Sequence, residues 1–184
     1  MFSVGALVVY PAQGVGKVEG IEKQTIGGVE TELYIVRILS NNVTLMVPVT
    51  NAENVGLRSI YSREKGQQIM DYLQDRSDFT GYSGQNWNRR YREYSEKLKS
   101  EDLRDVAYVL KELFLISKDK ELSFGERRLM EQAMGLISME LSYALDIPQS
   151  EAKTKVEDLF SDIIAAREES ASGEGDEDEE ENSL

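Results

Sequence analysis

The chain has 184 residues, of which 40% are hydrophobic, and a formal net charge of −13, and it is long enough for one large domain or two small ones. It contains no Cys and no His, which excludes disulfides, thiolate and imidazole chemistry and the usual zinc sites, so we expect neither a metal nor a cofactor. No apolar run is long enough to cross a membrane, and the start MFSVGALVVYPAQG lacks the basic region of a signal peptide, so we expect a cytoplasmic protein.

Residues 3–61 have the pattern of a small all-β domain. Runs rich in β-branched residues alternate with turn residues in five segments, GALVVYPAQG, VGKVEGIEKQTIGG, TELYIVRILSNN, VTLMVPVTN and VGLRSIY. Five short strands in this space indicate a strongly bent barrel, with bulges or corners at Gly14, Gly16 and Gly20. We place the first domain at residues 1–61.

The strand at residues 43–49, VTLMVPV, has an apolar outer face. Alternation predicts that the side chains pointing into the core are Val43, Leu45, Val47 and Val49. The side chains pointing outward would be Thr44, Met46 and Pro48. Because Pro48 cannot donate a ladder hydrogen bond, the strand should lie at a sheet edge, with Met46 exposed. Such an edge is a candidate for pairing with a strand of another protein. Alternatively, Met46 lies under a loop and Pro48 only ends the strand.

After Tyr61 the hydrophobic period becomes helical. Apolar stripes predict an all-α domain at residues 62–167, with helices near 62–74, 87–99, 101–117, 124–145 and 149–167. Ser123 and Glu126 have the spacing of a capping box before the long fourth helix. The polar segment DRSDFTGYSGQ, residues 75–85, indicates a loop.

Residues 168–184, EESASGEGDEDEEENSL, hold nine of the 34 acidic residues and no base, so the other 167 residues carry 25 acids against 21 bases. A segment with this charge and a single leucine cannot bury enough apolar surface to offset its ordering entropy, so we expect a disordered acidic tail. It would aid solubility or, alternatively, compete with an anionic ligand for basic side chains. The predicted fold class is α+β, with a β domain, a helical domain and this tail.

The segment QNWNRRYREYSEKLK, residues 85–99, places three Arg beside the only Trp. Asn86 is a suitable N-cap, so Trp87 would be the first helical residue. Arg89, Arg90 and Arg92 then occupy the first two turns, where the helix dipole disfavours cations, and this points to a phosphate partner. The alternative is that Trp87 packs in the core, because it shares one helix side with Tyr91, Tyr94 and Leu98.

Several separated segments together resemble the CarD/CdnL family of bacterial transcription regulators. They are YPAQGVGKVEGIE, VPVTNAENVGLR, and WNRRYREYSEKLKS followed by LSFGERRLMEQA, and the resemblance runs from about residue 3 to about residue 165. It implies an N-terminal Tudor-like (SH3-like) barrel that binds the β subunit of RNA polymerase, as in the transcription-repair coupling factor. It also implies that the helical domain contacts promoter DNA.

The resemblance assigns roles to both candidate segments. The polymerase-binding strand of the family matches Val43, Thr44, Leu45, Met46, Val47 and Pro48. Its DNA-binding residues match Trp87, Arg89, Arg90 and Arg92, with the indole inserted at the upstream edge of the melted promoter region. Some relatives carry Arg at the positions of Gln24 and Met46, so this chain departs from the family there.

The resemblance, together with the residues that carry it, implies a regulator that binds polymerase and promoter DNA with little sequence specificity and stabilises the open complex. A monomer suffices for this action. The alternative is an adaptor whose helical domain binds another protein through Trp87 as a hot spot. We expect no enzymatic activity, because the scattered Asp and Glu pairs have the pattern of solvated helix faces.

Overall fold

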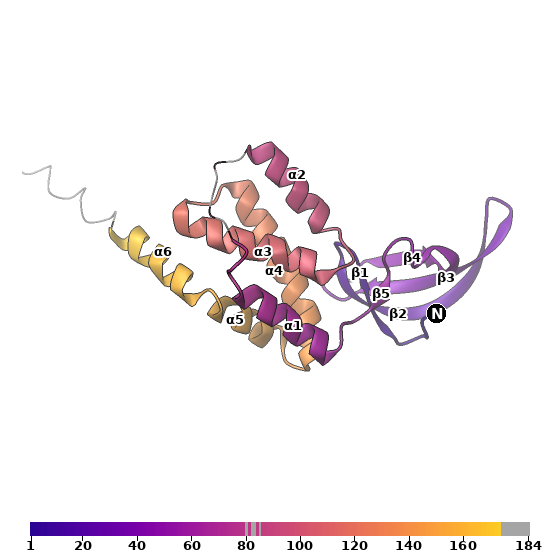
Figure 1. Ribbon diagram of the computed structural model, residues 1–184. Coiled ribbons are helices and arrows are strands. Elements are labelled where there is room, and N and C mark those ends of the chain that lie inside the picture. The colour runs from indigo at the N-terminus through magenta and orange to yellow at the C-terminus, as the bar shows by residue number, and fades with distance from the viewer. Residues whose placement is uncertain (80, 82–83, 85, 174–184) are drawn as a thin grey trace, which may run out of the picture.

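The computed structural model describes residues 1–79, 81, 84 and 86–173, in which a sheet comes first and helices follow, as predicted for an α+β chain (Figure 1). The strands are β1 (Leu7–Tyr10), β2 (Gly14–Ile26), β3 (Val29–Ile38), β4 (Thr44–Pro48) and β5 (Arg58–Ser59). The α-helices are α1 (Arg63–Gln74), α2 (Trp87–Lys97), α3 (Leu103–Asp119), α4 (Phe124–Leu145), α5 (Gln149–Asp158) and α6 (Ser161–Gly173).

The five strands form one antiparallel sheet in the order β4-β3-β2-β1-β5. The register of β2 against β3 shifts between Val18 and Gly20, so the predicted bulge at Gly20 is confirmed. Gly16 is required by close packing, because a Cβ there would lie 2.7 Å from Cγ1 of Val36. One face of the sheet buries a core that includes Val8, Tyr34, Ile38 and Val47. Closure of this sheet into a Tudor-like barrel stays a prediction.

The helical domain is built around α3 and α4. The predicted stripe on α3 is fully buried, with exposed fractions of 4% or less at Leu103, Val106, Ala107, Leu110, Leu113 and Phe114. Its partners on α4 include Leu129, Ala133, Ile137 and Leu141. Hydrophobic burial on both helices therefore holds the domain together.

Local capping determines where the helices begin. Ser123 Oγ accepts from the backbone N–H of Glu126, and the Glu126 carboxylate accepts from the backbone N–H of Ser123, so the predicted capping box is confirmed. Asn86 caps α2 as predicted, because its Oδ1 accepts from the backbone N–H of Asn88 at 2.9 Å. The helix α3 begins after Asp102, two residues later than its predicted start.

The prediction of one helix over residues 149–167 is wrong, because α5 ends at Asp158 and α6 begins at Ser161. Arg76 Nη2 donates to the carbonyl of Leu159 at 2.7 Å, and the N–H of Ile163 bonds instead to the carbonyl of Phe160. The Leu159 carbonyl therefore accepts from Arg76 instead of from the N–H of Ile163, and the series of i to i−4 backbone hydrogen bonds is interrupted there. The helix α6 continues to Gly173, past residue 168, where the sequence predicts that the tail begins. Residues 174–184 of the expected disordered tail lie outside the described residues.

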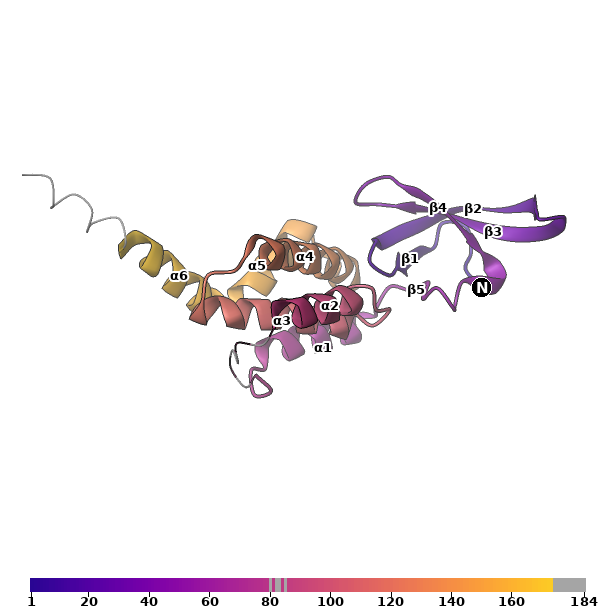
Figure 2. The same cartoon turned by 90° about the horizontal axis from the view of Figure 1, so that it is seen from above.

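The sheet lies at one end of the helical domain in both views (Figures 1 and 2). Leu136 of α4 lies against Gly14 of β2, where an added Cβ would be 3.4 Å from Leu136 Cδ2. Leu136 is half-buried and packs against the helical core as well as against the sheet. No helix within the described ranges is both long and apolar enough to span a membrane.

Candidate nucleic-acid and polymerase interfaces

The strand β4 lies at an edge of the sheet, as predicted from Pro48. Met46 is 57% exposed and stands opposite Ile35 of β3, while Pro48 stands opposite Leu33. Directly opposed residues share one face of an antiparallel pair. The outer face of this edge therefore presents the apolar side chains of Ile35, Met46 and Pro48, which we call the β4 strip, whereas Leu33 is only 2% exposed. The predicted exposure of Met46 is confirmed.

The inward orientation predicted for Val43 is wrong. Val43 is 44% exposed and precedes the strand, because β4 begins at Thr44. The connection from β3 turns at Asn42, which has a φ of 58°, so the alternation of strand faces does not extend to Val43. Of the other predicted inward residues, Val47 is 4% exposed and Leu45 is half-buried against the same core.

Cations close to the β4 strip are paired with carboxylates. Arg37 lies opposite Thr44 and has its Nε 2.9 Å from Glu19 Oε1, and Lys23 Nζ lies 3.3 Å from Glu30 Oε1. Gln24 is half-buried in β2, with its Nε2 3.4 Å from Glu22 Oε2. A partner of this surface would therefore meet apolar side chains and neutral pairs rather than the Arg found in some relatives.

Trp87 is the first residue of α2 and packs against two neighbours. A Cβ on Gly125 of α4 would lie only 3.0 Å from the indole Cζ2, so the ring packs directly on that glycine. The ring of Tyr91 also lies near the indole, 5.3 Å away, centroid to centroid, with an interplanar angle of 58°. Trp87 is half-buried and Tyr91 is 45% exposed, whereas Tyr94 and Leu98 are each 1% exposed. The aromatic side of α2 is thus buried in the core at the C-terminal end of the helix and is partly exposed at its N-terminal end.

The three arginines of α2 have different environments. Arg89 and Arg92 are exposed and lie three residues apart, on neighbouring parts of the solvent side of the helix. Arg90 is only 8% exposed, and its Nη2 lies 3.6 Å from Glu126 Oε1. The structure therefore brings Arg89 and Arg92 to the surface in the first two turns of α2, two and five residues after Trp87, but not Arg90, whose predicted role as a phosphate contact does not fit its place.

Glu126 joins α2 to the start of α4. Its fully buried carboxylate accepts hydrogen bonds from Lys120 Nζ at 2.6 Å and the backbone N–H of Ser123 at 2.8 Å, in addition to the Arg90 pair. Burial alone would raise the pKa of the Glu126 carboxyl, but these hydrogen bonds and the Lys120 charge outweigh it, and the pKa is lowered. The Arg90–Glu126 pair therefore fixes α2 on α4 next to the contact of Trp87 with Gly125.

Sequence reasoning missed two residues at the start of α4. Phe124 is 78% exposed and precedes the glycine that carries the indole, and Arg128 is exposed one helical turn further along the same side. The available signal was that Phe124 is apolar but falls outside the buried stripe of α4. The exposed or half-buried aromatic and basic side chains at the starts of α2 and α4 are Trp87, Tyr91, Phe124, Arg89, Arg92 and Arg128, and we call this set the aromatic–basic face.

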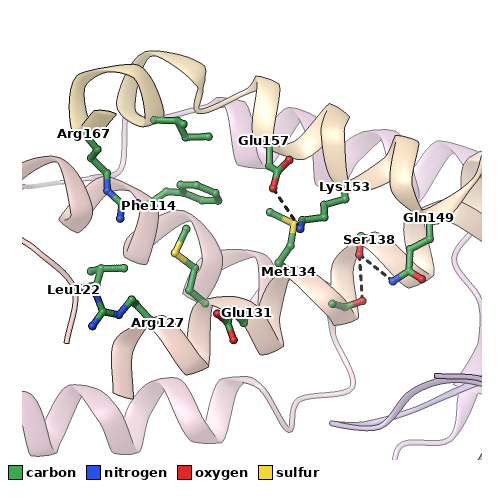
Figure 3. A pocket seen from close by; sticks show the side chains of 13 residues that line it. Phe114, Leu122, Arg127, Glu131, Met134, Ser138, Gln149, Lys153, Glu157 and Arg167 are labelled. Atoms are coloured by element: carbon green, nitrogen blue, oxygen red, sulfur yellow. Dashed lines mark hydrogen bonds and ion pairs between the residues drawn. The ribbon is translucent and has the colours of Figure 1, made fainter. Parts of the chain in front are cut away.

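A separate groove of about 440 Å³ lies between α4, α5 and α6 (Figure 3). Met130 and Met134 line it, and Arg127 and Arg167 stand at one end. None of the predicted site residues lines this groove. Within the described ranges, no three His, Cys, Asp or Glu side chains are grouped so that they could hold a metal ion. The candidate site is therefore an exposed surface, which suits a macromolecule better than a small ligand.

Comparisons with known proteins agree with this two-part arrangement. Residues 2–61 match the CarD-like/TRCF RID domain, and residues 68–157 match the CarD C-terminal domain. The chain is also similar to a Bacillus subtilis (strain 168) protein named "Putative transcription factor YdeB", with 26% identity over 156 residues that cover 84% of this chain and 99% of that protein. The chain therefore belongs to the CarD family of transcription factors.

Proposed function

We propose that this protein anchors to the β subunit of RNA polymerase through the β4 strip and stabilises the promoter open complex through the aromatic–basic face. The observation that carries the DNA half is the position of Trp87. Its indole packs on Gly125 and Tyr91 and remains partly exposed, and two exposed arginines follow it in the first two turns of the same helix. The polymerase half is supported by the match of residues 2–61 and by the free apolar edge at Met46.

A held indole is suited to the edge of melted DNA. Because Trp87 is already packed on one neighbour, it loses little rotamer freedom when a base stacks on it. Stacking of an aromatic side chain on a base contributes about 1–3 kcal/mol, which lengthens an open complex by roughly one to two decades. Arg89 and Arg92 would hold phosphates, and neither kind of contact identifies a base, so little sequence specificity is expected.

Tethering explains how an acidic chain can act on DNA. Once the β4 strip holds polymerase, the contact of the helical domain with the promoter becomes intramolecular, and its effective concentration reaches about the millimolar range. Weak contacts by a few arginines then suffice. One copy of the chain carries both surfaces, so the action requires only a monomer.

The Trp87→Ala variant tests the DNA half. It should shorten the lifetime of a promoter open complex challenged with competitor DNA about tenfold or more, while binding to a β-subunit fragment stays unchanged. Tyr143→Ala is the matched control, because Tyr143 is a 41% exposed aromatic residue at the other end of α4. An open-complex lifetime that Trp87→Ala leaves unchanged would sink this assignment.

The adaptor alternative has one observation in its favour, the exposed Phe124, because aromatic side chains are enriched at protein interfaces. Salt dependence separates the two functions. If Arg89 and Arg92 hold phosphates, changing both to Ala should reduce the slope of log affinity against log salt by about two in assays of the polymerase–promoter complex. A slope that does not change would favour a protein partner for this face.

A further inference from the structure

We infer that Arg58 is a positioning residue that holds the polymerase-binding sheet and the DNA-binding helices in one fixed relative orientation. This inference rests on the proposed function, because it concerns the geometry between the β4 strip and Trp87. Arg58 belongs to β5, the last strand, and its partner Glu140 belongs to α4. The pair therefore joins the two domains directly, at the place where β5 approaches the helices.

All three nitrogens of the Arg58 guanidinium donate hydrogen bonds at this boundary. Its Nη1 and Nη2 donate to the two carboxylate oxygens of Glu140 at 2.6 and 2.9 Å, and its Nε donates to the carbonyl of Glu101 at 2.5 Å. It also stacks over the Tyr61 ring, 4.3 Å from the centroid. A two-point contact between Arg and a carboxylate fixes orientation as well as distance.

The carboxylate side of the pair is equally constrained. The Glu140 side chain is 2% exposed, and its Oε1 also accepts from the backbone N–H of Tyr61 at 3.1 Å. The Tyr61 hydroxyl donates to Asp102 Oδ1 at 2.9 Å, at the start of α3. The connection between β5 and α1 is thus bonded to two helices of the helical domain. It behaves as part of the interface rather than as a flexible linker.

The orientation matters because the two proposed binding surfaces lie on different domains. Strand β4 and the start of α2 are not neighbours, so their separation depends on the domain boundary (Figures 1 and 2). A rigid boundary concentrates the tethered indole at one place on the promoter, whereas a loose one spreads it over a larger volume. Removing the guanidinium leaves the Glu140 charge buried and loosens this boundary.

The test compares Arg58→Ala with Arg76→Ala. Arg76 makes a closely matched set of contacts, two hydrogen bonds to the Asp162 carboxylate at 2.8 and 2.9 Å, one to the carbonyl of Leu159 and a stack over Phe160, but all of them lie inside the helical domain. Each variant is assayed for binding to a β-subunit fragment, for free-DNA binding at low salt, for open-complex lifetime, and for domain separation by small-angle X-ray scattering.

We expect Arg58→Ala to broaden the distribution of domain separations and to shorten the open-complex lifetime about tenfold, with both separate binding affinities unchanged. Arg76→Ala should leave the scattering and the lifetime as in the wild type. Glu140→Gln, which keeps the side-chain shape, replaces Arg58→Ala in the test if that variant does not fold. It should shorten the open-complex lifetime too, but by a smaller factor. If the wild type lengthens the lifetime and the Arg58 and Glu140 variants do so equally, the positioning role is wrong. If the wild type does not lengthen it, the proposed function itself fails.

Discussion

Replacing Glu126 with Gln should weaken the attachment of α2 to the start of α4. The amide keeps the size of the side chain but removes the charge that accepts from Lys120 Nζ at 2.6 Å and from the Ser123 N–H at 2.8 Å. It also removes the opposite charge 3.6 Å from Arg90. Hydrogen bonds to a charged group contribute about 1.5–3 kcal/mol and neutral ones about 1 kcal/mol, so two weakened bonds should lower the unfolding free energy by about 2–3 kcal/mol.

Thermal unfolding measures this loss. For a chain of this length, about 2–3 kcal/mol corresponds to a fall in Tm of roughly 4–12 °C, seen by far-UV circular dichroism and by the fluorescence of Trp87, the single Trp, which packs on the residue before Glu126. Glu121→Gln is the control, because Glu121 and its partner Arg127 are 84% and 49% exposed and their pair should contribute less than about 0.5 kcal/mol. Equal Tm values for the two variants would refute the reasoning.

The pH dependence gives a second measurement on the same variant. The pKa of Glu126 is lower in the folded chain than its ordinary value, because hydrogen bonds and the Lys120 charge outweigh burial. The unfolded chain therefore binds this proton more readily, and the stabilisation is present above about pH 4.3 and is lost as the pH falls through the folded pKa. The stability difference between wild type and Glu126→Gln should shrink in that acidic range. A constant difference would contradict the assignment.

Two further predictions concern other parts of the chain. Met46→Asp should weaken binding to a β-subunit fragment at least about tenfold in a pull-down or titration, because it places a charge on the apolar β4 strip. Val29→Asp should have no effect, since Val29 is 66% exposed at the far end of the β2–β3 hairpin. Burial, together with the hydrogen bond to Asp102, raises the pKa of Tyr61 to about 12, so its contribution to stability is complete below about pH 10 and is lost as the pH rises toward 12. Tyr61→Phe should flatten that alkaline loss in chemical denaturation.

The helix boundaries show which parts of the fold are encoded locally. The predicted span of α4, residues 124–145, agrees with the structure because Ser123 and Glu126 cap it within four residues of sequence. The break between α5 and α6 was not predictable in this way, because the donor to the Leu159 carbonyl is Arg76, which is 83 residues away in the sequence. Local patterns predict where a helix begins, and long-range hydrogen bonds decide where it is interrupted.

The candidate site shows a similar division. The edge position of β4 followed from Pro48, and the N-cap at Asn86 placed Trp87 at the start of α2. The sequence analysis predicts the same phosphate contact for Arg89, Arg90 and Arg92. Arg90, however, is four residues before the buried Tyr94 and lies on the same side of the helix. Its burial depends on Glu126, a charge on another helix that the sequence pattern did not connect to it.

The burial of Arg90 changes how the positive charge of α2 should be interpreted. Three cations in the first two turns oppose the helix dipole, and a phosphate partner was one reason for them. For Arg90 the buried Glu126 carboxylate already supplies a nearby negative charge, so this residue needs no external ligand. Arg89 and Arg92 are exposed and, among the residues that the structure describes, pair with no buried carboxylate of this kind, and Arg128 is exposed on α4. The proposed phosphate contact therefore uses few cations, which suits a protein whose DNA contact is made after it is anchored to polymerase.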